Sequence, residues 1–158
     1  MNPREQTARA MAFFEASDDV ATLYAALGEV APRAKRMVAA FIAKGDEDAI
    51  PGPADLRPAR QAATKDEALK TLKAASDFSL LQTLARSIGR RIETIEIAAS
   101  ADFPEGVRVA VPETPKYPAT GARVEGTVEA TGTMLTVLLD SGETWEGPPS
   151  LARLAGTA

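Results

Sequence analysis

The sequence has no cysteine and no histidine, and aromatic residues make up only 5% of its 158 residues. Without cysteine there is no disulfide, no thiol nucleophile and no Cys-ligated zinc. Without histidine the chain lacks the usual general base and the commonest metal ligand. The sequence also has no Gly-rich phosphate loop and no metal-binding motif in their place. We therefore expect a protein that is not an enzyme and that holds no metal and no cofactor.

Long hydrophobic runs are also missing. No stretch approaches the ~20 apolar residues that a membrane-spanning helix needs. The first residues, Met-Asn-Pro-Arg-Glu-Gln, are not followed by the apolar core of a secretory signal. The sequence thus predicts a cytoplasmic protein without a membrane partner. A structural component of a virion, made in the cytosol, fits these features equally well.

Positive charge is scarce toward the C-terminus. The chain carries 18 Lys and Arg against 22 Asp and Glu, a net charge of −4. Residues 1–100 hold 14 basic and 14 acidic residues, whereas residues 101–158 hold 4 basic and 8 acidic residues. Affinity for nucleic acid comes largely from neutralising phosphates. The acidic C-terminal region is therefore a poor surface for DNA or RNA, and nucleic acid is not the favoured partner.

The C-terminal third shows the period of two that marks a strand with one buried and one exposed face. Apolar and polar residues alternate over 107–111 and again over 122–130. A β-branched run over 133–139 and a short segment over 143–146 predict two further strands. Glycine-containing turns connect the last three strands into a meander.

A stiff loop over 112–121, with three prolines, follows the first of these strands. A strand, a long loop, a three-strand meander and a one-turn element after Gly147-Pro148-Pro149 together resemble the small SH3-like barrels of the Tudor and KOW type. The resemblance covers about the last third of the chain, and it implies a small antiparallel SH3-like β-barrel over 101–158. A β-meander packed on helices is the alternative interpretation.

Before this region, capping signals and helical spacing predict about five short helices, so the expected fold class is α+β. Asn2 caps the first helix, with Pro3 at its first position. Gly28 ends the second helix and Pro32 opens the third.

Two more helices are expected in the middle of the chain. Thr64 and Glu67 have the spacing of a capping box at the start of the fourth helix. Ser79 caps the fifth helix and Gly89 ends it. The segment 90–99 fits a helix by the spacing of its isoleucines and a strand by its Ile and Thr content, so both alternatives stay open.

These elements divide the chain into four parts. Residues 1–45 are expected to form a helical bundle or hairpin, and residues 64–100 a second helical segment. Between them, 46–63 holds three prolines, an acidic run and little periodicity, which predicts a linker or an arm. Residues 101–158 are expected to form the barrel.

Part of the segment 64–100 resembles a helix-turn-helix. In that family a small residue packs between the helices, a glycine turns the chain and a β-branched residue of the second helix fills the core. Ala85, Gly89 and Ile95 have that spacing, and the resemblance implies a DNA-binding regulator. The position after the glycine is Arg90 rather than an apolar residue. A helix that ends at Gly89 and is followed by a core strand is the simpler interpretation.

Arg86, Arg90 and Arg91 form a basic cluster in this segment and are the candidate contacts to nucleic acid. The second helix of the helix-turn-helix would also carry Glu93 and Glu96, and carboxylates that face phosphates lower affinity. The alternative is a solvated helix face, in which Glu93 pairs with one of the arginines for less than ~1 kcal/mol.

The candidate partner-binding residues lie in the barrel region: Tyr117, Glu143, Trp145 and Glu146. Peptide-binding SH3-like barrels use aromatic side chains near their long first loop, and Tyr117 lies in that loop. Trp145 is either part of this surface or a core residue, and the sequence leaves both open. The two glutamates would surround the surface with negative charge and favour a basic or polar partner.

Taken together, these features predict a non-catalytic interaction protein. It would act as an adaptor or assembly component that binds another protein, or a second copy of itself, through the barrel. A DNA-binding regulator that uses residues 64–100 is the second hypothesis, and a phage or virion structural component is the third.

Overall fold

The computed structural model describes residues 1–156, and the chain falls into two compact units, Met1–Arg91 and Ile92–Ala158. We call the first the helical unit and the second the sheet unit. The boundary lies inside helix α4 (Phe78–Ser100), whose first part belongs to the helical unit and whose last part belongs to the sheet unit. The chain therefore divides within a helix.

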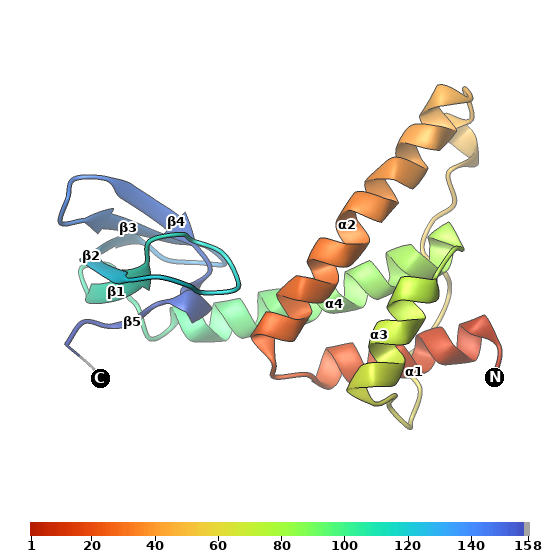
Figure 1. Cartoon of the computed structure of the whole chain (residues 1–158), viewed down its shortest axis with the longest axis horizontal. Helices are drawn as coiled ribbons and strands as arrows, with labels where there is room; N and C mark the ends of the chain where they lie inside the picture. Colours follow the sequence, from red (N-terminus) through yellow and green to blue (C-terminus); the bar gives the residue numbers. More distant parts are fainter. Residues whose placement is uncertain (157–158) are drawn as a thin grey trace. The chain divides into compact units, whose positions relative to one another are not determined.

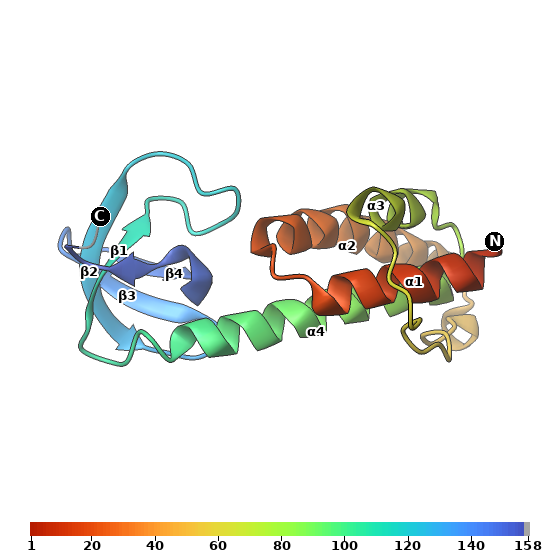
Figure 2. The ribbon, with the colours of Figure 1, turned by 90° about the horizontal axis from the view of Figure 1, so that it is seen from below.

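The helical unit contains α1 (Pro3–Ala16), α2 (Val20–Ala43), the short 3-10 helix η1 (Glu47–Ala49), α3 (Lys65–Ala74) and the first part of α4. Both ribbon views show α1 and α3 side by side (Figures 1 and 2). The core of this unit consists mainly of aliphatic and alanine side chains: Ala10, Met11, Phe14, Leu23, Ala26, Val30, Ala63, Ala68, Leu72, Leu80, Leu81, Leu84 and Ile88. No helix within residues 1–156 combines the length and the apolar character that a membrane span requires.

The predicted starts of two helices are confirmed. The Asn2 side chain accepts a hydrogen bond from the Glu5 backbone N–H at 2.8 Å, and Pro3 is the first residue of α1. Thr64 and Glu67 form the predicted capping box at the start of α3. These caps satisfy backbone N–H groups that have no partner inside the helix.

The prediction of about five short helices is wrong. Residues 1–156 contain four α-helices, because α2 is a single helix of 24 residues that passes through both Gly28 and Pro32. These two residues are four apart, so the missing N–H of Pro32 and the unbonded carbonyl of Gly28 belong to the same helical hydrogen bond. The helix loses one bond there, and burial of Leu23 and Val30 on either side keeps it continuous.

A second correction concerns α4, which is continuous from Phe78 to Ser100. The residue that caps this helix is Asp77 rather than Ser79, because the Asp77 side chain accepts a hydrogen bond from the Leu80 N–H in the first turn of α4. The helix does not end at Gly89, and the segment 90–99 is helical. Buried residues recur at intervals of three and four on both sides of the glycine: Leu81, Leu84, Ile88, Ile92 and Glu96. This continuous buried face outweighs the β propensity of Ile and Thr.

The segment 46–63, predicted as a linker or an arm, packs along the helical unit after η1. The Ala59 N–H donates to the Ala8 carbonyl of α1 at 2.9 Å. The Ala54 N–H donates to the Thr83 hydroxyl of α4 at 2.9 Å. Figure 2 shows the segment passing beside α1 before it enters α3.

The sheet unit contains the last part of α4 and five antiparallel strands in the order β4-β3-β2-β1-β5. The strands are β1 (Arg108–Pro112), β2 (Arg123–Ala130), β3 (Leu135–Leu139), β4 (Thr144–Gly147) and β5 (Arg153–Leu154), with the 3-10 helix η2 (Pro149–Leu151) before the last. The first four strands agree with the predicted strands to within two residues at each end. The predicted one-turn element after the prolines is η2.

The predicted SH3-like β-barrel is wrong, because the sheet is open. β4 and β5 lie at opposite ends of the strand order, and no backbone pairing joins them within residues 1–156. β5 pairs with β1 over two residues only, Val109 with Leu154 and Ala110 with Arg153. The segment Pro148-Pro149 separates β4 from β5 and has no N–H groups to donate, which interrupts the ladder.

One face of the sheet forms the core of this unit, as the alternation in the sequence predicts. The core residues are Phe103, Val109, Val111, Val128, Leu135, Val137, Trp145 and Leu151. The opposite face carries polar residues and exposed Leu138 in one cross-strand row: Arg108, Thr127, Leu138 and Thr144.

Candidate functional site

Trp145 is a core residue. It is 3% exposed, and its indole Nε1–H donates a hydrogen bond to the Pro112 carbonyl at 2.9 Å. The sequence left a core position and a surface position open for this residue, and the structure shows the core position. Because Pro112 is the last residue of β1, the indole ties β4 to the start of the loop that follows.

That loop, residues 113–122 between β1 and β2, is called the proline loop here, and Pro115 and Tyr117 attach its first half to the rest of the sheet unit. At its base the Glu113 N–H donates to the Ala122 carbonyl at 3.3 Å. Further along, Pro115 packs on Gly147 at the end of β4, where an added Cβ would lie 2.7 Å from the Pro115 Cβ. A side chain at position 147 would push the loop off β4, so this contact requires glycine.

Tyr117 supplies the next attachment of the loop. Its ring is half-buried against the core, and its hydroxyl lies 2.8 Å from Ser150 Oγ on η2. Burial raises the pKa of Tyr117 above its usual 10.0. The tyrosine therefore points into the unit, whereas its neighbours in the loop are exposed: Glu113, Thr114, Pro115, Lys116, Pro118, Ala119 and Thr120.

Glu96 is the residue whose place the sequence analysis missed. The sequence placed it on the second helix of the helix-turn-helix, as a carboxylate that would lower affinity for DNA, whereas in the structure it is 2% exposed. Its carboxylate accepts the Ser150 N–H on Oε1 and the Ser150 hydroxyl on Oε2, each at 2.7 Å. Since the single Ser150 hydroxyl proton goes to Glu96, Tyr117 is the donor in its bond to Ser150. The sequence feature that indicates its burial is the spacing of four residues between Ile92 and Glu96, which places Glu96 on the buried face of α4.

β4 presents a free edge beside the proline loop. The Leu139 N–H donates to the Glu143 carbonyl at 2.8 Å, so these two residues form a hydrogen-bonded pair. In an antiparallel ladder such pairs alternate with pairs that are not hydrogen-bonded. Trp145 therefore bonds to β3, whereas the backbone N–H and C=O groups of Thr144 and Glu146 point away from β3. Both residues are exposed, and no backbone hydrogen bond from another segment of residues 1–156 occupies these groups.

Two acidic side chains lie at this edge. Glu143 and Glu146 are both exposed. The sheet unit contains 4 basic and 10 acidic residues, a net charge of −6, whereas the helical unit contains 14 basic and 12 acidic residues. Arg108, one of the few cations, is already paired with Asp140 through hydrogen bonds of 2.6 and 2.7 Å, which lower the pKa of the Asp140 carboxyl. The edge therefore lies in a strongly acidic unit.

The helix-turn-helix interpretation is wrong, because Arg86, Arg90 and Arg91 lie on the continuous helix α4 and no turn separates two helices there. Arg91 binds the end of α1: its Nε donates to the Ser17 carbonyl at 2.8 Å, and its Nη2 lies 2.6 Å from Asp18 Oδ1. Arg86 and Arg90 are exposed and four residues apart, so they share one side of the helix.

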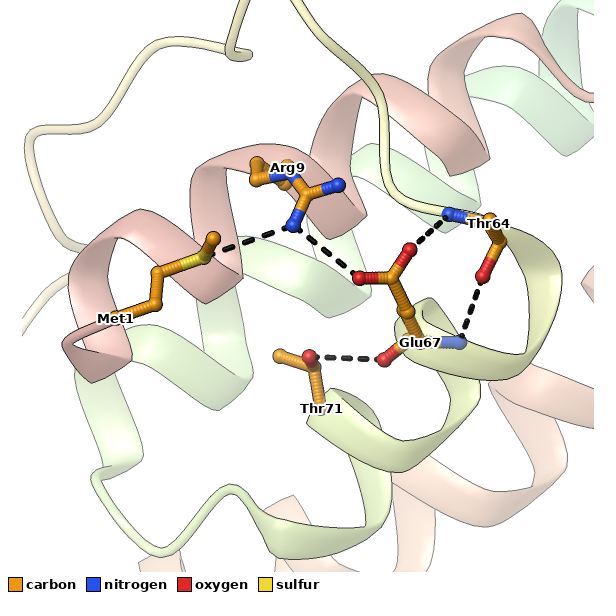
Figure 3. Close-up of polar contacts among 5 residues, drawn as sticks. All are labelled: Met1, Arg9, Thr64, Glu67 and Thr71. Atoms are coloured by element: carbon orange, nitrogen blue, oxygen red, sulfur yellow. Dashed lines mark hydrogen bonds and ion pairs between the residues drawn. The ribbon is translucent and has the colours of Figure 1, made fainter.

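A second polar cluster joins α1 to α3 in the helical unit (Figure 3). Arg9 Nη1 lies 3.2 Å from Glu67 Oε2, and the other carboxylate oxygen accepts the Thr64 N–H at 3.1 Å. Hydrogen bonding to Thr64 lowers the pKa of Glu67. Arg9 also contacts Met1 Sδ, and the Thr71 hydroxyl donates to the Glu67 carbonyl. These contacts cap α3 and join it to α1.

Within residues 1–156 no group of three or more Asp or Glu side chains lies together as a metal site would require. Comparisons with protein-family models, with curated proteins and with solved structures find no match to this chain. Function is therefore inferred from the edge of β4, the proline loop and the charge around them.

Proposed function

We propose that the chain is a non-catalytic interaction protein that binds another protein through one surface of the sheet unit. This edge surface consists of the free edge of β4 and the adjoining proline loop. The bound segment lies extended beside β4 and adds a strand to the sheet, which is a recurrent mode of peptide recognition. The segment that binds there belongs to another protein, is extended and carries basic side chains.

The observation that carries this proposal is the outward direction of the backbone groups of Thr144 and Glu146. Unpaired N–H and C=O groups along an edge are a template for another strand. β4 has no neighbour on this side among residues 1–156. Because main-chain hydrogen bonds supply the affinity, the surface does not need the indole of Trp145, which is buried.

The rigidity of the proline loop supports the proposal. The bond from Trp145 to Pro112 holds the residue just before the loop, and the loop itself is attached through Pro115 to Gly147 and through Tyr117 to η2. A surface that is ordered before binding loses little conformational entropy when its partner docks. Pro115 lies at the end of β4, so the loop forms a fixed boundary for a segment paired with that strand.

Charge selects the kind of partner. Exposed glutamates at an edge disfavour pairing of that edge with a second copy of itself, because the like charges of Glu143 and Glu146 would meet. The same glutamates attract Lys and Arg side chains of a different segment. The excess of acidic residues in the unit also disfavours DNA as a partner.

The test uses a synthetic peptide of alternating valine and lysine, with an alternating valine and glutamate peptide of the same length as its control. We expect the lysine peptide to bind the isotope-labelled full chain and to shift the amide signals of residues 144–147. The glutamate peptide should not bind. Equal binding of both peptides would contradict the role of the acidic side chains.

Two variants of one residue then locate the site. Thr144→Pro removes an outward N–H without removing a bond to β3, and proline is tolerated on an edge strand. It should abolish peptide binding and leave the fold intact, as judged by the amide spectrum. Thr144→Val keeps the N–H and should bind like the unchanged chain. Binding that survives Thr144→Pro would contradict pairing at this edge.

A further inference from the structure

The C-terminal half of α2 carries an apolar face that the helical unit buries only in part. In the N-terminal half, Leu23, Ala26 and Val30 are buried. From residue 31 to the end of the helix no residue is buried, although the sequence stays apolar at Ala31, Ala34, Met37, Val38, Phe41 and Ile42. Figure 1 shows this half of α2, in orange, extending beyond α1 and α3.

Two side chains of this half make contacts with neighbouring elements of the unit. Phe41 packs edge-on against Phe78, with ring centroids 6.1 Å apart. Arg33 Nη1 donates to the Leu72 carbonyl at the end of α3 at 2.7 Å. Ile42, on the other side, is 49% exposed. It belongs to a stripe of residues seven and four apart, which lie on one side of the helix: Ala31, Val38 and Ile42.

Charges of opposite sign lie along this stripe and beyond its C-terminal end. Lys35 lies within the stripe, three residues before Val38, with Arg36 next to it in the sequence, and the acidic run Asp46-Glu47-Asp48 follows the end of the helix at Ala43. All five side chains are exposed, and none forms an ion pair within residues 1–156. The helix rises ~12 Å from Lys35 to Ala43, and the acidic run follows beyond its C-cap at Lys44. Lys44 reduces the negative charge of the acidic end without reversing it.

We propose that this face of α2 binds the same face of a second copy of the chain, with the two helices antiparallel. A twofold interface requires a surface that is complementary to itself. In the antiparallel arrangement, Val38 and Ile42 of the two copies meet at the centre. The basic end of each copy then lies opposite the acidic end of the other, so the charge pairing occurs twice. A parallel arrangement would place like charges together.

This interface is independent of the edge surface, because it is formed by the helical unit and the edge surface belongs to the sheet unit. Either interaction can therefore fail in experiment without affecting the other. Since both are surfaces of one chain, a dimer would present two copies of the edge surface, which raises the effective concentration of the second binding event.

The first experiment measures the mass of the full chain by light scattering or sedimentation over a wide range of concentration. The mass should rise toward twice that of the single chain. Ile42→Lys should lower the association constant at least about tenfold. Its matched control is Met134→Lys, which alters an equally exposed apolar residue (46%) in the sheet unit and should leave association unchanged.

The second experiment reverses the charge at one end at a time. Lys35→Glu with Arg36→Glu makes both ends acidic, and Glu47→Lys with Asp48→Lys makes both ends basic. Neither double variant should self-associate, whereas an equimolar mixture of the two should form dimers that weaken with added salt.

Three results would overturn the proposal. They are a chain that stays monomeric over the whole range, a dimer that Ile42→Lys does not weaken, and a mixture of the two charge variants that does not associate.

Discussion

At the scale of single residues, the sheet unit depends on a short series of hydrogen bonds from Glu96 through Ser150 to Tyr117. The carboxylate accepts both Ser150 donors, which leaves Ser150 Oγ as the acceptor for the tyrosine hydroxyl. These bonds attach the end of α4, η2 and the proline loop to one another. A buried carboxylate thereby helps to hold the loop that borders the edge surface.

We predict that Glu96→Ala destabilises the chain by about 1.5–3 kcal/mol, the range for a hydrogen bond to a charged group. Glu96→Gln keeps one acceptor and should lose less. Glu93→Ala is the matched control, because Glu93 lies on the same helix but is exposed, and it should change stability by less than about 0.5 kcal/mol. Urea unfolding measures all three. Equal stability of Glu96→Ala and Glu93→Ala would show that the buried carboxylate contributes nothing.

At the scale of elements, the continuity of α2 and α4 leads to a prediction about their internal glycines. A Cβ at Gly28 or Gly89 would meet no atom within 4 Å, and neither residue has a positive φ. Gly28→Ala and Gly89→Ala should each stabilise the chain by about 0.5–1 kcal/mol and increase helicity, measured by circular dichroism during thermal unfolding.

The contrasting variant is Gly142→Ala, because Gly142 has a φ of +94° in the turn before β4 and alanine there is strained. Gly142→Ala should therefore lower the free energy of unfolding of the chain. If Gly28→Ala or Gly89→Ala destabilised in the same way, that helix would end at its glycine in a left-handed cap, as the sequence suggested.

The elements differ in how far the sequence predicts them. The first four strands follow from local alternation, and the caps at Asn2 and Thr64 follow from the residue types that satisfy free N–H groups. Gly28 and Pro32 each predict the end of a helix when they are considered alone. Together they cost α2 a single shared hydrogen bond, and whether the helix continues depends on the burial of the residues around them. The open sheet could not be predicted, because closure depends on pairing between β4 and β5, which local periodicity does not report.

The candidate site divides in the same way. The acidic character around Glu143 and Glu146 and the stiffness of the proline loop can be read from the sequence. The burial of Trp145 depends on packing between strands, and so does the free edge of β4. For these reasons the surface rests on backbone groups of β4 rather than on the aromatic side chains that the sequence favoured.

At the scale of the whole molecule, charge determines how stability responds to acid. Hydrogen bonds hold the pKa of three carboxyls below their usual values: Asp19 through Thr22, Glu67 through Thr64 and Asp140 through Arg108. A group with a lowered folded pKa stabilises the fold above its unfolded pKa, and this contribution is lost as the pH falls through the folded pKa. Glu15, whose pKa is raised by burial, acts in the opposite sense.

Three carboxyls have a lowered pKa and one has a raised pKa. We therefore predict that the chain loses stability as the pH falls below the usual pKa values of 3.8 for Asp and 4.5 for Glu. Urea midpoints measured across this range test the prediction. Asp140→Asn should reduce the slope, because it removes one of the three contributions. Stability that rises steadily with acid would contradict it.

The central claim is that a basic extended segment adds to the edge of β4, and amide hydrogen exchange tests it most directly. In the free chain the N–H groups of Thr144 and Glu146 point away from β3 and should exchange faster than those of Trp145 and Gly147. At saturation with the valine–lysine peptide, the account predicts that exchange slows at Thr144 and Glu146 and changes little at the other two residues. Unchanged exchange at Thr144 and Glu146 in the saturated complex would contradict the account.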